Sequence, residues 1–202
     1  MAAIVIASRN EHKVEEIRKL LAGLSVDVLS LRDFPDAPEV DEDGTTFRAN
    51  ALKKARVISQ FTGLSALADD SGLEVESLDG KPGVWSARFA GESASDADNN
   101  RKLLRCMADV PPEERAAQFR CVIALVSPKG AEELVEGICS GVIIEEERGS
   151  GGFGYDPLFL VPHLGKTFAE LSTEEKNRIS HRGKALQQVL PIVREWLEQG
   201  LI

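Results

Sequence analysis

The stretch Ala66-Leu67-Ala68-Asp69-Asp70-Ser71-Gly72-Leu73 joins a short apolar run to two adjacent carboxylates, a hydroxyl and a glycine. The run predicts a buried strand, Leu64 to Ala68, with the two aspartates at its end, and Leu73 to Val75 continue after the glycine. Adjacent carboxylates repel each other and are costly to desolvate, which indicates a divalent cation bound by their oxygens. The alternative is a turn, because Asp, Ser and Gly also favour tight turns.

The composition is that of a globular protein. The chain has 202 residues, 43% hydrophobic and 28% charged, and we predict one domain over residues 1–202. The apolar runs are too short to span a bilayer, and a net charge of −9 argues against nucleic acid as the main partner. Three widely spaced cysteines and an N-terminus without a basic leader segment favour the reducing cytoplasm.

A second polar stretch follows the apolar run Ala3 to Ala7, which predicts a strand buried on both faces. Asn10 is placed as the N-cap of a helix, so that Ser8 to Lys13 form a loop at a helix N-terminus, where free N–H groups can meet phosphate oxygens. A lysine in the first turn opposes the helix dipole unless an anion lies beside it. Lys13 is therefore a phosphate-binding candidate, with a solvated surface lysine as the alternative.

The helix predicted over Phe47 to Phe61 follows an acidic turn. Glu42 in that turn either favours the helix start or supplies a second carboxylate to a metal at Asp70. Further along, Ser95 and Asp98 form a capping box that begins another helix. Strands are predicted over Phe119 to Val126, Glu133 to Ile138 and Gly141 to Ile144.

The third unusual stretch, Gly149 to Pro157, holds Phe153 between glycines. Such an aromatic can stack on a nucleobase, and the alternative is a flexible hairpin loop with a core aromatic. After it, Ser172 to Glu175 form a capping box before Lys176, and His181 and Arg182 begin the last helix. Cations at a helix start are unfavourable without a nearby anion, so they too point to an anionic ligand.

With these residues in view, the sequence resembles the inosine triphosphate pyrophosphatases, which hydrolyse non-standard purine nucleoside triphosphates. The matching segments are Ser8-Arg9-Asn10-Glu11-His12-Lys13, Glu42-Asp43-Gly44-Thr45-Thr46-Phe47, Ala68-Asp69-Asp70-Ser71-Gly72-Leu73, Gly152-Phe153-Gly154-Tyr155-Asp156-Pro157 and Ser180-His181-Arg182-Gly183. They run from the first predicted strand to the last helix. One departure is Arg9, which stands where the family loop commonly has a glycine.

The resemblance implies an α/β fold, with an elongated mixed central β-sheet flanked by helices and two lobes with a cleft between them. It also implies a homodimer, Mg²⁺, and cleavage of ITP, dITP or XTP to the monophosphate and pyrophosphate. Asp70 matches the general base and, with Glu42, the metal site. The positions that match nucleotide contacts are Ser8, Arg9, Asn10, Glu11, His12, Lys13, Ser71, Phe153, Gly154, Tyr155, Asp156, Lys176, His181 and Arg182.

Two other functions stay open from the sequence. A related pyrophosphatase for other modified nucleotides would share the phosphate chemistry and differ in the residues that contact the base. A non-catalytic nucleotide-binding module would not need Asp70. Inosine and xanthine carry a 6-keto acceptor where adenine carries an amino donor, so we expect hydrogen-bond donors near Phe153 and His181 to exclude ATP.

Overall fold

The computed structural model describes residues 2–202, and of His12 it describes the main chain without the side chain. By their internal contacts these residues divide into two compact units. Unit 1 comprises Met1–Asp70, Val122–Glu136 and Ala185–Ile202, and unit 2 comprises Ser71–Cys121 and Gly137–Lys184. The single domain expected over residues 1–202 stays a prediction.

The strands of residues 2–202 form one mixed seven-stranded sheet in the order β2-β1-β3-β4-β5-β6-β7. Their bounds are β1 (Ala3–Ile6), β2 (Asp27–Ser30), β3 (Ser65–Val75), β4 (Ala116–Val126), β5 (Glu132–Ile143), β6 (Phe159–Val161) and β7 (Lys166–Thr167). β1 is parallel to β2 and β3, whereas β6 is antiparallel to β5 and β7. The predicted mixed sheet with flanking helices is confirmed.

The helices are α1 (Glu11–Leu21), α2 (Phe47–Thr62), α3 (Asp96–Cys106), α4 (Thr173–Ile179) and α5 (His181–Glu198). Short 3-10 helices lie at Leu31–Asp33, Glu76–Leu78, Gly83–Arg88, Pro112–Glu114 and Phe168–Glu170. The capping boxes predicted at Ser95 and Ser172 are both present, with Asp98 and Glu175 as the third residues of their helices. Local sequence therefore sets where α3 and α4 begin.

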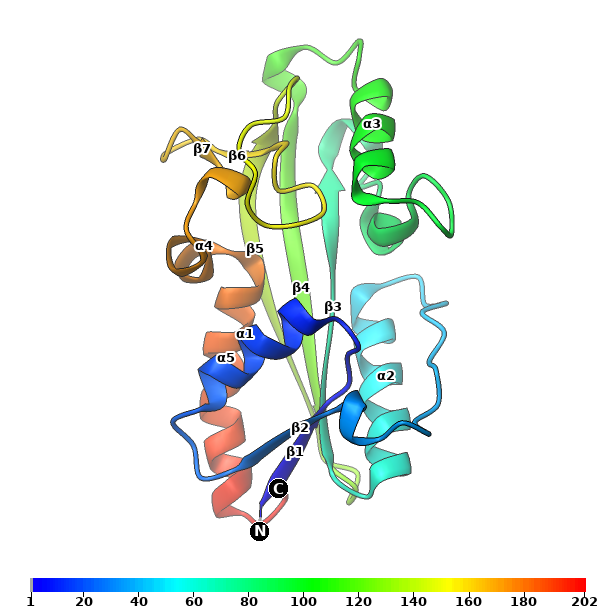
Figure 1. Cartoon of the computed structure of the whole chain (residues 1–202), viewed down its shortest axis with the longest axis vertical. Coiled ribbons are helices and arrows are strands. Elements are labelled where there is room, and N and C mark those ends of the chain that lie inside the picture. Colours follow the sequence, from blue (N-terminus) through cyan, green and yellow to red (C-terminus); the bar gives the residue numbers. More distant parts are fainter. Residues whose placement is uncertain (1) are drawn as a thin grey trace. The chain divides into compact units, whose positions relative to one another are not determined.

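Unit 1 is built on the buried strand β1 and helix α2. Ile4, Val5 and Ile6 are fully buried, as expected for a strand covered on both faces. Helix α2 ends at Gly63, whose φ of 68° is the left-handed cap conformation that glycine adopts without a Cβ clash. The N- and C-termini lie at one end of this unit (Figure 1), where the Ser65 hydroxyl donates to the Leu201 carbonyl over 2.7 Å.

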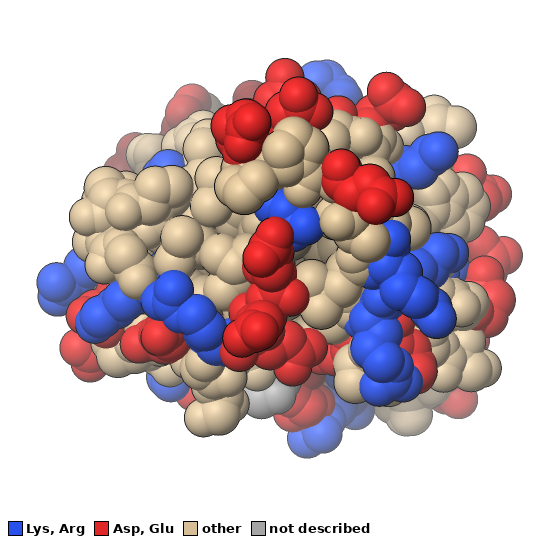
Figure 2. All heavy atoms as spheres, turned by 90° about the horizontal axis from the view of Figure 1, so that it is seen from above, with Lys and Arg blue, Asp and Glu red and all other residues tan. Residues whose placement is uncertain are grey.

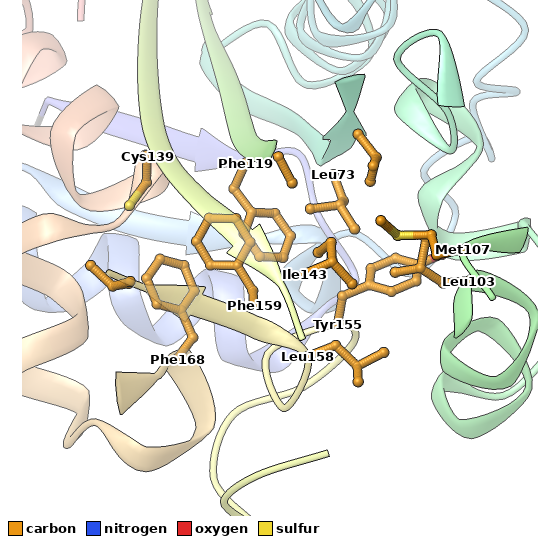
Figure 3. Packing of buried hydrophobic residues seen from close by; sticks show 13 residues of the cluster. Leu73, Leu103, Met107, Phe119, Cys139, Ile143, Tyr155, Leu158, Phe159 and Phe168 are labelled. Carbon is orange, nitrogen blue, oxygen red and sulfur yellow. The ribbon is translucent and has the colours of Figure 1, made fainter. Parts of the chain in front are cut away.

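Unit 2 has a core of aromatic and aliphatic side chains from β3, β4, α3 and the loop before β6 (Figure 3). The rings of Phe119 and Phe159 lie 4.7 Å apart at an interplanar angle of 57°, and Phe159 and Phe168 lie 4.8 Å apart at 52°. Such tilted pairs are favourable because the positive edge of one ring faces the negative face of another. Phe168 anchors in this core the chain between β7 and α4.

Two breaks predicted between strands are absent. β3 is continuous from Ser65 to Val75, so the expectation that Asp69 and Asp70 end a strand is wrong, and so is the turn alternative. Asn50 and Lys13 bind the two carboxylates, so both can be buried within the strand. β5 is likewise one strand where two were predicted. A Cβ at Gly141 would lie 2.5 Å from the Leu160 carbonyl oxygen, so this glycine permits close approach of β6 inside the strand.

The charged surface is mixed in sign on the face shown in Figure 2, where Asp and Glu side chains are interspersed with Lys and Arg. This agrees with a net charge of −9 spread over 33 acidic and 24 basic residues. Among the described helices, none combines the length and apolar character needed to cross a membrane.

Candidate functional site

The predicted site residues gather in two polar clusters, one in each unit. The carboxylate cluster of unit 1 comprises Lys13, Glu42, Asn50, Lys54, Asp69 and Asp70. The aromatic cluster of unit 2 comprises Ser71, Phe119, Phe153, Asp156, Lys176, His181 and Arg182. Both depend on β3, since Asp70 and Ser71 are consecutive residues of that strand.

The register of β1 and β3 places the predicted phosphate loop beside the carboxylates. Ile6 pairs with Leu67, and Ser8 and Asp69 follow two residues later on each chain segment. Lys13 Nζ lies 2.9 Å from Asp69 Oδ2 in a pair whose side chains are 17% and 1% exposed. The interpretation of Lys13 as a solvated surface lysine is therefore wrong.

Helix α2 supplies two further members of the carboxylate cluster. Asn50 Nδ2 donates to Asp70 Oδ2 over 3.0 Å, and Asn50 Oδ1 accepts from the Gly44 amide over 2.8 Å. Four residues later on the same helical face, Lys54 Nζ donates to Glu42 Oε1 and, over 2.7 Å, to the Asp69 carbonyl oxygen. One face of α2 thus joins the acidic turn to β3.

Burial and charge set the protonation of this cluster. Burial raises the pKa of Asp70 to about 6, and the Glu42 carboxylate adds to that rise, while Lys54, Asn50 and Lys13 oppose it. Burial alone lowers the pKa of Lys54, but the carboxylates of Asp69, Glu42 and Asp70 outweigh it and leave the pKa raised. Asp70 is therefore a carboxylate suited to accept a proton near neutral pH, beside an ammonium that stays charged.

The donor set fits a magnesium site that relies on its substrate. Among the described side chains, no three His, Cys, Asp or Glu groups converge as metal ligands. Glu42 and Asp70, the predicted metal-site pair, are close enough that the charge of one raises the pKa of the other. Mg²⁺ typically binds one or two carboxylates together with phosphate oxygens and waters, so two carboxylates are sufficient protein ligands.

The rest of the predicted phosphate loop divides into two groups. Ser8 Oγ accepts from the Asn10 amide over 3.2 Å, and Asn10 Oδ1 caps α1 by accepting from the Lys13 amide over 3.3 Å. Arg9 donates to the Ala37 carbonyl over 3.2 Å, and the exposed Glu11 pairs with Arg32 over 2.6 Å. The side chain of His12 lies outside the described residues. The structure thus brings Lys13 to the carboxylates and directs Arg9 and Glu11 to other partners.

The aromatic cluster is arranged around Phe153, which is half-buried rather than a core aromatic. Its amide donates to Asp156 Oδ2 over 2.9 Å, and Lys176 Nζ lies 2.5 Å from the same oxygen. Lys176 Nζ and the Arg182 guanidinium carbon lie 4.8 and 5.8 Å from the Phe153 ring centroid. Two cations therefore contact the ring.

Strand β3 and the core position the cations of this cluster. Arg182 donates to Ser71 Oγ over 3.2 Å. The His181 ring stacks on Phe119, with centroids 4.7 Å apart and an interplanar angle of 13°. Burial raises the pKa of Asp156, although Lys176 beside it acts in the opposite direction. His181 and Arg182 are thus held at the start of α5 by residues of β3 and β4.

One predicted contact residue has its side chain elsewhere. Tyr155 is buried in the core (Figure 3), its hydroxyl donates to the Ser86 carbonyl over 2.8 Å, and burial raises its pKa. The Tyr155 phenol is therefore directed into the fold of unit 2. Any contact of this residue with a ligand would be through its main chain.

Sequence reasoning missed Asn50, Lys54 and Phe119. A signal existed for the first two, because Asn50 and Lys54 are spaced i, i+4 beside the apolar stripe that begins at Phe47. The buried amide of Asn50, 0% exposed, is the kind of polar group that needs partners. Phe119 carried no such signal, since an aromatic in a strand is ordinary core.

Comparisons with known proteins agree with this arrangement. A sequence model of the Ham1 family matches residues 4–192. A dITP/XTP pyrophosphatase of Geobacter sulfurreducens is 59% identical over 186 residues, which are 92% of this chain and 94% of that protein. Another from Desulforamulus reducens is 54% identical over 190 residues, which are 94% of each chain.

Solved structures show the same fold. A HAM1 protein from Coxiella burnetii has a TM-score of 0.91 and 44% identity, covering 96% of this chain and all of that one. A Ham1 protein from Staphylococcus aureus has a TM-score of 0.87 and 40% identity, covering 96% and 98%. By sequence and by fold, the chain belongs to the Ham1 family.

Proposed function

We propose that this chain is a Mg²⁺-dependent nucleoside triphosphate pyrophosphatase. Its substrates would be ITP, dITP and XTP, each hydrolysed to the monophosphate and pyrophosphate and so removed from the nucleotide pool. The relatives named dITP/XTP pyrophosphatases support the substrate class. The observation that carries the chemistry is the buried Asp70 carboxylate, which accepts from Asn50 and is the neighbour of Asp69, whose oxygens bind Lys13 and Lys54. We also propose a cytoplasmic homodimer.

The carboxylate cluster would bind the triphosphate and activate water. Asp70 would orient a water molecule and accept its proton, the role of a carboxylate held in place by a neighbouring hydrogen-bond donor, here Asn50. Glu42 and Asp70 would hold Mg²⁺, which when bound withdraws charge from the phosphate oxygens. Lys13 and Lys54 would bind phosphate oxygens and stabilise charge on the departing pyrophosphate.

The aromatic cluster would recognise the purine. Phe153 would stack on the base, while donors from His181 and Arg182 would face the 6-keto oxygen. An adenine amino group would meet these donors without an acceptor, which is the costly kind of mismatch. Because Asp70 and Ser71 are consecutive in β3, one strand would carry both the base of the reaction and a residue that positions Arg182.

The test is kcat/KM for ITP, XTP, GTP and ATP, with pyrophosphate release as the readout. We expect ITP and XTP to be far better substrates than ATP, and GTP to be poor because of its 2-amino group. Equal values for ITP and ATP would contradict the proposed substrate class. Release of phosphate instead of pyrophosphate would contradict the proposed reaction.

A further inference from the structure

Both main-chain polar groups of Gly154, its N–H and its C=O, are hydrogen-bonded to side chains of helix α3. The Gly154 amide donates to Asp96 Oδ2 over 2.7 Å, and Asn100 Nδ2 donates to the Gly154 carbonyl oxygen over 3.2 Å. Asp96 and Asn100 are four residues apart and lie on one face of α3. Their side chains thus form a two-point clasp on a single residue of the glycine-rich loop.

We propose that Asp96 and Asn100 are positioning residues that set the selectivity of the site for the purine base. This inference rests on the proposed function, because it concerns the loop that would contact the base. By fixing the orientation of the Gly154 main chain, the clasp fixes the direction of the Phe153 ring on one side and the Asp156 carboxylate on the other. Neither Asp96 nor Asn100 needs to touch the nucleotide.

Inside the loop, the hydrogen bond from the Phe153 amide to Asp156 Oδ2 over 2.9 Å does not use the N–H or the C=O of Gly154. Gly154 has a φ of 60°, the left-handed conformation that favours glycine, and no side chain of its own packs to fix it. Glycine also loses the most conformational entropy on ordering. The N–H and the C=O of Gly154 are instead bound by Asp96 and Asn100 from outside the loop.

Asn100 contacts the loop through a buried amide that donates hydrogen bonds. It is 4% exposed, and Nδ2 donates to Glu147 Oε1 over 3.0 Å as well as to Gly154. Among the described residues, Asn100 Oδ1 has no hydrogen-bond partner, so the amide serves here as a donor. A carboxylate of the same shape at this position would face the Gly154 carbonyl and the Glu147 carboxylate, and both contacts would become repulsive.

Helix α3 is a firm support for the clasp. Its first turn is closed by the capping box of Ser95 and Asp98, and Leu103 and Met107 are fully buried in the core of unit 2. A clasp on a packed helix holds a loop to a narrower range of positions than contacts from another loop would. The geometry of the base contacts would then be set by α3, more than 40 residues before the loop in the chain.

The experiment compares four variants in two measurements. Asp96→Ala removes the acceptor for the Gly154 amide, and Asp96→Asn keeps an oxygen acceptor but removes the charge. Asn100→Asp removes the donor without changing the shape. Arg101→Ala is the matched control on the same helix, since Arg101 is exposed and pairs with Asp98. The measurements are kcat/KM for ITP and ATP, and amide hydrogen exchange of residues 149–157 in the nucleotide-free protein.

We expect Asp96→Ala and Asn100→Asp to lower kcat/KM for ITP about tenfold, as for the loss of one or two hydrogen bonds with a charged group. The ratio of ITP to ATP should fall with it, and exchange of the loop amides should become faster. Asp96→Asn should restore most of both properties. Arg101→Ala should match the wild type in both.

Faster exchange with an unchanged ITP to ATP ratio would overturn the proposal, because the clasp would then be merely structural. Unchanged exchange in Asp96→Ala would overturn it as well, since the loop would not depend on α3. Failure of the proposed function is distinguishable from both outcomes: the wild-type protein itself would then show no preference for ITP over ATP. Asp96 is exposed, so its variants keep the test decisive even if Asn100→Asp does not fold.

Discussion

The two polar clusters hold their cations in different ways. In the carboxylate cluster, Lys13 and Lys54 lie against carboxylate and carbonyl oxygens. In the aromatic cluster, Lys176 and Arg182 lie beside the Phe153 ring, and one of them pairs with Asp156. The first arrangement concentrates charge of both signs around a raised-pKa carboxylate, and the second surrounds a flat ring with donors. This difference is the basis on which the proposed function assigns the chemistry to the carboxylate cluster and base selection to the aromatic cluster.

Removal of metal should have the largest effect, and it should act through the carboxylate cluster. A chelator in excess should abolish pyrophosphate release, and added Mg²⁺ should restore it, because without a cation between them the Glu42 and Asp70 carboxylates repel the triphosphate. The measurement is the initial rate at fixed ITP with chelator and Mg²⁺ varied. Full activity in excess chelator would refute the magnesium proposal.

Next in size should be Asp70→Asn. The loss of a general base typically costs about 10²- to 10⁴-fold, and we expect kcat to fall by about 10³-fold while nucleotide binding is retained. Steady-state pyrophosphate release gives kcat, and calorimetric titration with ITP gives the binding affinity. Asp36→Asn, an exposed carboxylate in the same unit, is the control and should leave both unchanged. Near wild-type turnover in the Asp70 variant would remove Asp70 from the mechanism.

A matched pair of lysines separates position from charge within the carboxylate cluster. Lys54→Met should lower kcat/KM by about 100-fold, because it leaves buried carboxylates without their cation and removes a phosphate ligand. Lys53→Met should stay within about twofold of the wild type, because the pair of Lys53 with Asp43 is exposed and such pairs contribute little. Circular dichroism would check that both variants are folded. Equal losses in the two variants would show that net charge, not position, is what matters.

In the aromatic cluster, truncation should alter recognition more than chemistry. Phe153→Ala should lower kcat/KM for all purine substrates together, by the ~1–3 kcal/mol of a lost stacking contact, without changing their order. His181→Ala should instead narrow the gap between ITP and ATP. His163→Ala, which removes an exposed histidine, is the control. An unchanged ITP to ATP ratio in His181→Ala would exclude His181 as a base-contacting residue.

The smallest expected effect is on stability and its pH dependence. The pKa of Asp70 is raised from 3.8 to about 6, so between these values the folded protein binds a proton that the unfolded chain releases. The free energy of unfolding of the metal-free protein should therefore fall as pH rises from about 4 to about 6, by about 2 kcal/mol from this group. Asp70→Asn should abolish that fall and be more stable than the wild type at neutral pH.

Urea midpoints across this pH range, in chelator, would measure the effect. Asp36→Asn should keep the wild-type pH dependence. If the free energy of unfolding depends on pH equally in the wild type and in Asp70→Asn, the ionised Asp70 does not destabilise the folded protein. In that case the contrast with the aromatic cluster would rest on contacts alone.

Much of this protein was determined by local sequence. The caps at Thr46, Ser95 and Ser172 and the stop at Gly63 are made between residues a few positions apart, so they can be predicted without the fold. The same holds for the buried strand β1 and for the phosphate loop that follows it. Lys13 could be singled out because its place in a helix first turn is unfavourable without an anion.

Tertiary structure alone decided how these pieces are connected. The continuity of β3 through Asp69 and Asp70 depends on Lys13, Asn50 and Lys54, which come from α1 and α2. The contact of Arg182 with Ser71 joins residues 111 positions apart. Whether a buried charge is tolerated depends on partners that only the folded chain brings within hydrogen-bond distance, and periodicity carries no information about them.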